Sequence, residues 1–316
     1  MSDPRCADVS LERDEPAWAT ASVVRGWVLV EQPGAWGRDA LFESRLPPAV
    51  AEFLVEEGRP HRVRTVLLRQ PDRPRTGRRR CFVASSGRPR PWMEHRTLSD
   101  PDELLALDVA AAAGPQPVGF GQPWDRPLYL VCTNGRHDPC CARLGRPIVR
   151  SLLAGLRGPN AVAGRAGQVW ECSHIGGDRF AGNLVCLPHG LYFGRLEPDE
   201  AAEVVARYEA GHIALDHFRG RAGDPFAVQA AEYLLRRETG LTGIDAVTPL
   251  AWRRRPGGSS TAVHFATEGG EEVDVEVEVA AAPPRLLTCT AGAEDRPPSY
   301  RLAGLIPRAG DAPAVH

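Results

Sequence analysis

The segment that decides the fold of this chain is Leu128-Tyr-Leu-Val-Cys132-Thr-Asn-Gly-Arg-His137-Asp-Pro-Cys140-Cys141. Its first residues are apolar or aromatic, which predicts a buried strand, and the pairs Asn-Gly and Asp-Pro that follow predict a loop. A helix is expected next, from about Arg143 to Leu156. A thiolate between a strand end and a helix N-terminus is favoured by the helix dipole. Three cysteines on one polar loop therefore favour a chemical role over simple burial.

A second segment with metal-binding residue types follows the expected helix: Val169-Trp-Glu-Cys172-Ser-His174-Ile-Gly-Gly-Asp178-Arg-Phe-Ala-Gly-Asn183. His174 and Asp178 flank two glycines, which let the backbone approach an inorganic group and donate N–H bonds to it. Soft and borderline donors on two separate loops are how a chain surrounds a metal ion or an iron–sulfur cluster. The two segments together predict a metal or redox centre.

These motifs resemble the sucrase/ferredoxin-like family of thioredoxin-like [2Fe-2S] proteins. The resemblance rests on Cys-x8-Cys, on the His-x-Gly-Gly loop with its trailing Phe-Ala-Gly-Asn, and on Pro188-His-Gly-Leu-Tyr-Phe-Gly-Arg195, and it covers roughly residues 20–240. The opening Trp27-Val-Leu-Val-Glu-Gln-Pro-Gly-Ala-Trp-Gly-Arg38 also looks like the bacterial members.

The family pattern implies a ligand set for the cluster. In fungal relatives two cysteines and two histidines, spaced His-x3-His, hold it. Carried over by position, this pattern implicates Cys132, Cys141 and His174, and the fourth place falls on Asp178, where this chain departs from the pattern.

The residues themselves leave the fourth ligand open. An aspartate oxygen is a harder donor than iron–sulfur clusters usually take, and Asp178 has a possible structural partner in Arg179. Cys172 competes because residues 172 and 174 of a strand project to the same side. Cys140 is a further alternate or a spare thiol, and His137 is a candidate ligand or proton donor. The remaining cysteines are expected to be non-ligands: Cys186 in an apolar strand, and Cys6, Cys81 and Cys289 far from the motifs.

Composition excludes several classes of protein. A net charge of −2 argues against binding nucleic acid or an anionic membrane surface, in spite of the basic run 75–80. No apolar stretch approaches the roughly 20 residues of a membrane span, and the first residues lack the apolar core of a secretory signal. We therefore expect a cytoplasmic protein whose eight cysteines do not form a disulfide framework.

The fold class expected is α/β (α+β), with two tandem thioredoxin-like units and a small antiparallel C-terminal appendage. Both halves repeat one order of elements, a parallel strand–helix–strand unit followed by a hairpin and a helix. The domains expected are an N-terminal unit without ligands (1–120), the ferredoxin unit (121–242), the appendage (243–308) and a disordered tail (309–316). The strands expected are 22–31, 62–68, 81–84, 92–97, 128–132, 168–173, 183–187, 191–196, 248–254, 261–266, 272–279, 285–289 and 300–305, and the helices 47–57, 99–113, 143–156, 197–210 and 224–239.

The leading functional hypothesis is an electron carrier, rather than a catalyst, with a [2Fe-2S] cluster, and proton-coupled electron transfer is a testable consequence of its histidine ligand. No Gly-x-Gly-x-x-Gly motif appears in the right context, so the electrons are expected to come from a partner such as a flavin-dependent reductase or a ferredoxin. The alternatives are a thioredoxin-type thiol–disulfide oxidoreductase, which the absence of Cys-x-x-Cys disfavours, and a zinc-binding structural protein.

Overall fold

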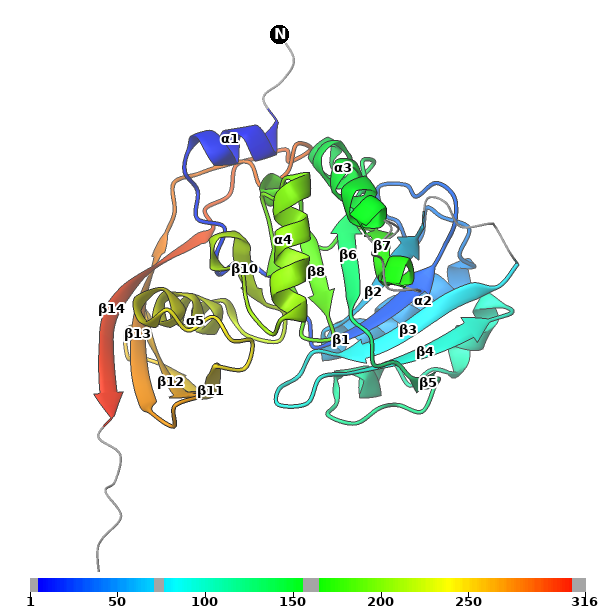
Figure 1. Cartoon of the computed structure of the whole chain (residues 1–316). Coiled ribbons are helices and arrows are strands. Elements are labelled where there is room, and N and C mark those ends of the chain that lie inside the picture. Colours follow the sequence, from blue (N-terminus) through cyan, green and yellow to red (C-terminus); the bar gives the residue numbers. More distant parts are fainter. Residues whose placement is uncertain (1–4, 71–76, 156–164, 309–316) are drawn as a thin grey trace, which may run out of the picture.

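The computed structural model describes residues 5–70, 77–155 and 165–308. The expected tail 309–316, most of the expected loop 71–80 and the expected helix end at Leu156 lie outside the described residues. The described chain is a mixed α/β structure built on two sheets (Figure 1): a ten-stranded mixed sheet, with the order β10-β9-β8-β6-β7-β2-β1-β3-β4-β5, and a separate four-stranded antiparallel sheet, with the order β11-β12-β13-β14.

The first half of the large sheet contains the expected strand–helix–strand unit and hairpin. Strands β1 and β2 pair in parallel around helix α2, and β3 pairs antiparallel with both β1 and β4. The bounds in this half are β1 Gly26–Glu31, α2 Pro48–Gly58, η1 Arg59–His61, β2 Val63–Arg69, β3 Arg79–Ser85, β4 Trp92–Leu98 and β5 Gln122–Pro123.

The prediction of one α-helix over 99–113 is wrong. Two 3-10 turns occupy the region, η2 Pro101–Ala106 and η3 Ala110–Ala113. The start signal is genuine, because the Asp100 carboxylate accepts from the N–H of Asp102 at 2.9 Å. The chain turns extended at Leu107, however, and this buries both Leu107 and Val109 in the core. Burial of these two side chains therefore overrides the local preference for helix.

The second half repeats the arrangement around β6 and β7, which pair in parallel. Helix α3 begins four residues before the expected Arg143, because the Asp138 carboxylate caps it by accepting from the N–H of Cys140 at 2.8 Å. Cys140 and Cys141 consequently lie in the first helical turn and not on the loop. The bounds are β6 Leu128–Cys132, α3 Pro139–Gly155, η4 Arg165–Gln168, β7 Val169–Cys172, η5 Asp178–Phe180, β8 Leu184–Leu187, β9 Leu191–Phe193 and α4 Pro198–Glu209.

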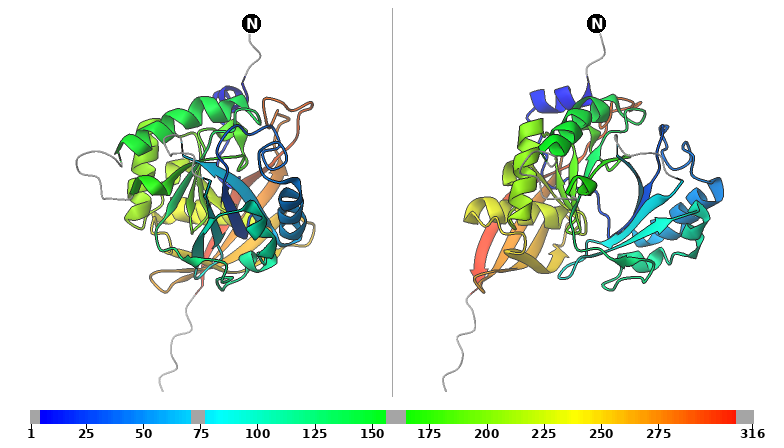
Figure 2. Two further views of the ribbon diagram at one scale, coloured as in Figure 1. Left: turned by 90° about the vertical axis from the view of Figure 1, so that its right-hand side faces the viewer. Right: turned by 45° about the vertical axis from the view of Figure 1, so that its right-hand side comes forward.

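The two halves join where β2 pairs antiparallel with β7, through Leu68↔Cys172 and Arg69↔Glu171. One sheet face of both halves shares a core of apolar residues, which includes Trp27, Trp170 and Tyr192. The opposite faces are covered by helices, α2 in the first half and α3 with α4 in the second (Figures 1 and 2). The ends of β6 and β7 thus lie beside the join, against the shared core.

The C-terminal region adds β10, helix α5 and the small sheet, which lie together at the β10 end of the large sheet (Figure 1). The expected antiparallel appendage is confirmed, except that residues 285–289 form no strand and contribute only the isolated bridge Arg285↔Asp295. The bounds are η6 Leu215–His217, β10 Phe218–Arg221, α5 Phe226–Thr239, β11 Val247–Arg254, β12 Ser260–Thr267, β13 Glu272–Ala281 and β14 Pro298–Arg308, with α1 Cys6–Glu12 preceding the large sheet. Within the described residues, none of these helices is both long and apolar enough to cross a bilayer.

Candidate metal centre

Cys132 and Cys172 end two neighbouring strands. They are register partners of the parallel pair β6 and β7, so their side chains share one face of the sheet, and each is at most 1% exposed. Cys141 reaches the same core from the first turn of α3, and its thiol is hydrogen-bonded to that of Cys132. Three of the expected ligand candidates therefore meet beneath the loop that joins β6 to α3.

Asp178 connects these thiols to the histidine loop. The thiol of Cys141 donates to Asp178 Oδ1 at 3.2 Å, and His174 Nδ1 lies 3.1 Å from the same oxygen. The structure thus brings together all four residues expected as ligands, in the chain of contacts Cys132–Cys141–Asp178–His174. Arg179 does not pair with Asp178, because its guanidinium donates to Glu15 at 2.8 Å.

His137 joins this group from the other loop. Its Nε2 lies 3.5 Å from Asp178 Oδ2, and its ring stacks on that of His174 with centroids 3.7 Å apart. The side chains of both histidines are partly exposed, at 26% and 31%, whereas Asp178 is 1% exposed. They border a surface pocket of about 380 Å³ together with residues of the loop after β1. The centre is therefore buried on its thiol side and open to solvent on its imidazole side.

Two polar atoms of this group have unmet hydrogen-bonding capacity. His174 Nδ1 and Asp178 Oδ2 are buried and make no hydrogen bond of good geometry to any described residue. Burial by itself would raise the pKa of Asp178, but the contacts from His137 and His174 outweigh it and hold the pKa well below its usual range. In turn, the Asp178 carboxylate raises the pKa of His137. A carboxylate kept ionised beside unpartnered nitrogen and oxygen atoms is suited to bind a cation.

The buried thiols point to the same conclusion. The hydrogen bond to Cys132, with burial, raises the pKa of Cys141 well above its ordinary value. Burial, with the neighbouring Cys132, does the same for Cys172. Several buried thiols and a carboxylate carry negative charge together only when a cation neutralises it. The donor set therefore fits a bound metal group.

The histidine loop, residues 174–178, also presents backbone donors to this region through its two glycines. The carbonyl of Ile175 accepts from Arg64, Ser22 and Tyr192. A planar trans peptide directs its N–H opposite to its carbonyl, so the N–H of Gly176 is turned away from those donors. The N–H groups of Gly176 and Gly177 have no acceptor among the residues that the structure describes. Free N–H groups of this kind are what the sulfides of an inorganic cluster accept from.

The first half of the chain covers the centre. The side chain of Asn134 donates to the carbonyl of Gly37 at 3.1 Å, and the carbonyl of Arg38 lies 3.3 Å from His137 Nδ1. The loop after β1, which has tryptophan and glycine where the loop after β6 has cysteines, therefore packs against that loop and fixes the position of His137.

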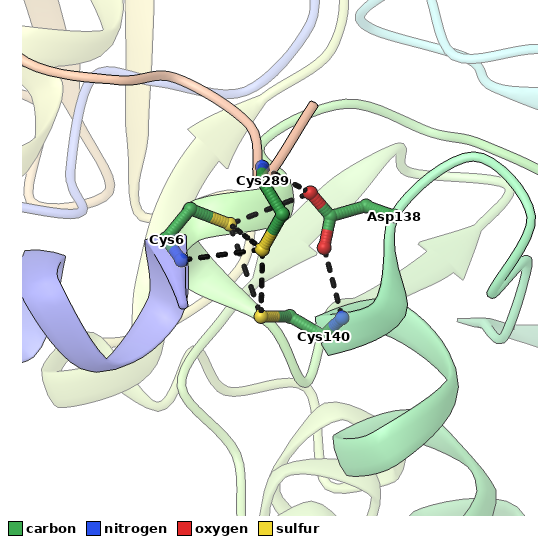
Figure 3. Close-up of side chains that lie close together, drawn as sticks. All are labelled: Cys6, Asp138, Cys140 and Cys289. Atoms are coloured by element: carbon green, nitrogen blue, oxygen red, sulfur yellow. Dashed lines mark hydrogen bonds between the residues drawn. The ribbon is translucent and has the colours of Figure 1, made fainter. Parts of the chain in front are cut away.

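Cys140 lies apart from these residues, although it is adjacent to Cys141. Its thiol contacts Cys6 and Cys289, beside Asp138 (Figure 3). The interpretation of Cys6 and Cys289 as far from the motifs is therefore wrong in space, while Cys81 and Cys186 are buried in strands as expected. No local signal in the sequence could have joined Cys6 to Cys289, because 283 positions separate them.

Two curated relatives match parts of the chain. Altered inheritance of mitochondria protein 32 from Eremothecium gossypii is 31% identical over 122 residues, which are 35% of this chain and 36% of that protein. The protein of the same name from Meyerozyma guilliermondii is 30% identical over 98 residues, which are 29% of this chain and 34% of that protein. The chain thus spans about a third of the length of these relatives. No solved structure matches it.

The expected family is confirmed. The sucrase/ferredoxin-like family model matches residues 17–220, which is more than half of the 316 residues. The match includes Cys132, Cys141, His174 and Asp178, the residues that converge on the centre. On this evidence the chain belongs to the sucrase/ferredoxin-like family.

Proposed function

We propose that this protein carries single electrons on a [2Fe-2S] cluster held by Cys132, Cys141, His174 and Asp178. The observation that carries the proposal is the continuous contact from the buried thiols to the Asp178 carboxylate, at 3.2 Å, and on to His174 Nδ1, at 3.1 Å. Membership in a family whose description includes ferredoxins supports it. The cluster would supply a one-electron couple, which none of the side chains here supplies.

The surrounding residues suit that role. The thiols lie in the shared apolar core, where water is excluded, and the free N–H groups of Gly176 and Gly177 offer hydrogen bonds that favour the added electron. A histidine ligand is neutral where a thiolate is anionic, so it raises the reduction potential and makes it depend on pH. His137, stacked on His174, gives a proton a short route between the centre and solvent.

A second ligand set replaces Asp178 by His137. Its basis is the stacking of the two imidazoles and their common contact with Asp178. This set has the composition of the fungal pattern, two cysteines and two histidines, with the second histidine on the other loop. In that case Asp178 would orient both imidazoles as a hydrogen-bond acceptor. Cys172, the register partner of Cys132, is a third candidate for the fourth place.

Electrons would pass through the imidazole side, since it is the exposed side of the centre. The pocket there is lined by both histidines and by the charged residues Arg38, Asp39 and Glu43. A mixed-charge rim of this kind suits a transient redox partner, such as a flavin-dependent reductase or a ferredoxin. The same proposal places the protein in the cytoplasm.

The finer fold assignment belongs to this proposal. The strand order β2-β1-β3-β4 of the first half recurs as β7-β6-β8-β9 in the second. In both, the first two strands of each order are parallel and the remaining pairs are antiparallel. We infer two tandem thioredoxin-like units, with boundaries at residues 1–120 and 121–242, of which only the second holds ligands.

The test is the visible spectrum of anaerobically purified protein, together with iron and acid-labile sulfide analysis. We expect visible absorption and about two iron and two sulfide per chain. Cys132→Ala and His174→Ala should abolish or strongly alter the absorption. Cys186→Ala is the control, because Cys186 is equally buried but lies in β8 on the opposite sheet face.

Other outcomes would support the alternatives. A colourless protein with zinc that is lost in Cys132→Ala would favour the zinc-binding protein. A colourless, metal-free protein with a reducible bond between Cys132 and Cys141 would favour the thiol–disulfide oxidoreductase. Either result contradicts the iron–sulfur proposal.

A further inference from the structure

A second group of metal-ligand side chains lies outside the candidate metal centre (Figure 3). Cys6 is the first residue of α1, Cys140 lies in the first turn of α3, and Cys289 belongs to the segment between β13 and β14. Their sulfur atoms form a compact triangle, with 3.8 Å from Cys6 to Cys140, 3.5 Å from Cys140 to Cys289 and 3.4 Å from Cys289 to Cys6.

Asp138 completes the group as a fourth donor. Its Oδ2 lies 3.5 Å from the Cys6 sulfur and accepts from the N–H of Cys289 at 2.7 Å. Its Oδ1 accepts from the N–H of Cys140 at 2.8 Å. Two backbone bonds therefore fix this carboxylate beside the triangle, and each oxygen keeps a lone pair for a further partner. Cys6, Cys140 and Asp138 are at most 4% exposed, and Cys289 is half-buried.

We propose that Cys6, Asp138, Cys140 and Cys289 form a tetrahedral zinc site. Zinc–sulfur bonds of about 2.3 Å place two sulfur atoms about 3.8 Å apart in a tetrahedron, and a zinc–oxygen bond of about 2.0 Å gives a sulfur–oxygen separation of about 3.5 Å. The three sulfur–sulfur distances and the sulfur–oxygen distance match these values to within about 0.4 Å.

The compactness of the group specifies one ion rather than a cluster. All four ligand atoms lie within 4.8 Å of one another. Ligands on different irons of an iron–sulfur cluster are farther apart than this, because the inorganic core lies between them. The three soft thiolates select zinc over magnesium or calcium, which bind through oxygen, and one carboxylate is an ordinary fourth ligand for zinc.

Hydrogen bonds to sulfur support thiolates at this position. The backbone N–H of Cys6 donates to the Cys289 sulfur at 3.3 Å, and the N–H of Ala7 donates to the Cys140 sulfur. The guanidinium of Arg143, which pairs with Asp8, also lies against Cys140. Such donors stabilise metal-bound thiolates and offset part of their negative charge.

A disulfide is the competing chemistry, and the geometry does not favour it. A disulfide needs one preferred pair of sulfur atoms about 2.05 Å apart. Here each sulfur lies almost equally far from the other two, and any pairing would leave the third thiol unpaired beside Asp138.

The site would be structural, since the protein fills all four positions. It would fasten α1 and the segment before β14 onto the start of α3, the turn that also carries Cys141. Two further contacts hold the segment between β13 and β14 in place. Arg38, in the loop after β1, donates to Thr290 at 3.3 Å, and Arg13, directly after α1, donates to the carbonyl of Pro284 at 3.4 Å. Zinc here would therefore hold α1 and the segment between β13 and β14 against the loop of the candidate metal centre.

The first test is zinc analysis of the purified full-length chain, followed by zinc K-edge absorption spectroscopy. We expect about one zinc per chain, with three sulfur neighbours at about 2.3 Å and one oxygen or nitrogen neighbour at about 2.0 Å. This measurement needs no variant and is blind to iron. A protein produced with ample zinc that holds none, or zinc with imidazole neighbours, would overturn the proposal.

Variants then locate the ion independently of the iron–sulfur proposal. Cys6→Ser and Cys289→Ser should lose most of the zinc and keep the visible absorption, whereas Cys81→Ser, a buried thiol in β3, should keep both. Zinc that is retained in Cys6→Ser but lost in His174→Ala would place it in the candidate metal centre and contradict the site. Non-reducing mass spectrometry that finds two of the three thiols joined, with no zinc, would also contradict it.

Discussion

Cys140 and Cys141 are neighbours in the chain, yet their thiols belong to different groups. The thiol of Cys141 donates to Asp178, whereas that of Cys140 lies 3.5 Å from the sulfur of Cys289. Successive residues of an α-helix point about 100° apart, so the first turn of α3 directs one thiol into the shared core and the other toward Cys6 and Cys289. One helical turn thus serves two separate sites.

The two adjacent cysteines should give opposite results when each is replaced. Cys141→Ser is expected to lose the visible absorption and keep zinc, and Cys140→Ser to lose zinc and keep the visible absorption. Metal analysis and absorption spectra of both variants test this, with each variant as the control of the other. Loss of both metals in both variants would mean that the sites do not form separately.

Replacing the unusual carboxylate should raise the reduction potential. Asp178→His restores the His-x3-His spacing and exchanges an anionic ligand for a neutral one, so we expect a cluster whose potential is higher by on the order of 100 mV. Asp178→Ala should yield a more labile cluster. Voltammetry of the protein bound to an electrode measures the potential of Asp178→His and the persistence of the cluster in Asp178→Ala. His137→Gln is measured for comparison. A cluster unchanged in Asp178→Ala but lost in His137→Gln would assign the fourth place to His137.

The histidine loop, residues 174–178, should tolerate no side chain at Gly177. Its φ is +80°, and an added Cβ would overlap the guanidinium of Arg219. Hydrogen bonds from this guanidinium to Asn183 and Thr20 hold it in place. Gly177→Ala is therefore expected to cost about 3 kcal/mol or more in the free energy of unfolding. The control is Gly211→Ala, where φ is +83° but no atom lies within 4 Å, so only about 1 kcal/mol of backbone strain applies. Equal losses in a denaturant titration would refute the steric argument.

The buried ion pairs of α5 should contribute strongly to stability. Glu232 bonds Arg88 at 2.6 Å and Arg236 at 3.0 Å, and its side chain is fully buried. Although burial alone would raise the pKa of Glu232, the charges of Arg88 and Arg236 lower it to about 2. Its contribution is thus fully present above the ordinary glutamate pKa, about 4.3, and is lost as the pH falls through about 2.

At neutral pH, Glu232→Gln should destabilise the protein by about 3 kcal/mol or more, because it leaves the buried guanidinium of Arg236 without its anion and leaves Arg88 only Asp224, at 3.4 Å. Glu203→Gln provides the comparison, since Glu203 pairs with Arg207 on the exposed face of α4, and its cost should stay below about 0.5 kcal/mol. Urea unfolding of the two variants measures the difference, and similar costs would count against the buried network.

His189 should make stability depend on pH between about 4 and 6.5. Burial, with the nearby charge of Arg221, lowers the pKa of His189 to about 4. The unfolded chain takes up its proton first as the pH falls, so stability declines from about pH 6.5 down to about 4, by about 3 kcal/mol, and levels off below. At neutral pH the ring is neutral and hydrogen-bonded to the hydroxyl of Tyr208 at 2.6 Å, so this loss of stability does not occur there.

His189→Gln should flatten this decline, so that it destabilises the protein less at pH 4.5 than at pH 7. Thermal unfolding at both values measures the slope, with the exposed His212→Gln as control. An unchanged slope in His189→Gln would mean that this imidazole is not the titrating group.

The sequence predicts the elements well where a local pattern and the packing agree. The apolar run ending at Cys132 and the cap and glycine around α5 are local signals, and the strands and helices follow them. The prediction failed at Leu107, where core packing ended a helix that Asp100 had started correctly. The predicted start of α3 is also too late, because the Asp-Pro pair at 138–139 predicts a loop but caps the helix in the structure.

The candidate metal centre was predictable because its donors lie in two motifs on the ends of paired strands. The role of His137 was only partly predictable, since it depends on the loop after β1, which comes from the other half of the chain. The second group of cysteines was not predictable, because its members share no motif. Proximity of Cys6 and Cys289 results from the path of the whole chain around the large sheet.

That path has a consequence for biosynthesis. Cys6 and Cys289 are 283 positions apart, and the whole region that matches the family lies between them. On the ribosome, residues 17–220 emerge and can fold before Cys289 has been translated, so Cys289 is the last ligand to reach the proposed zinc site, after the region that holds Asp138 and Cys140 has folded. A nascent or truncated chain that lacks Cys289 cannot complete the site, and zinc content would thus distinguish chains that include Cys289 from chains that stop before it.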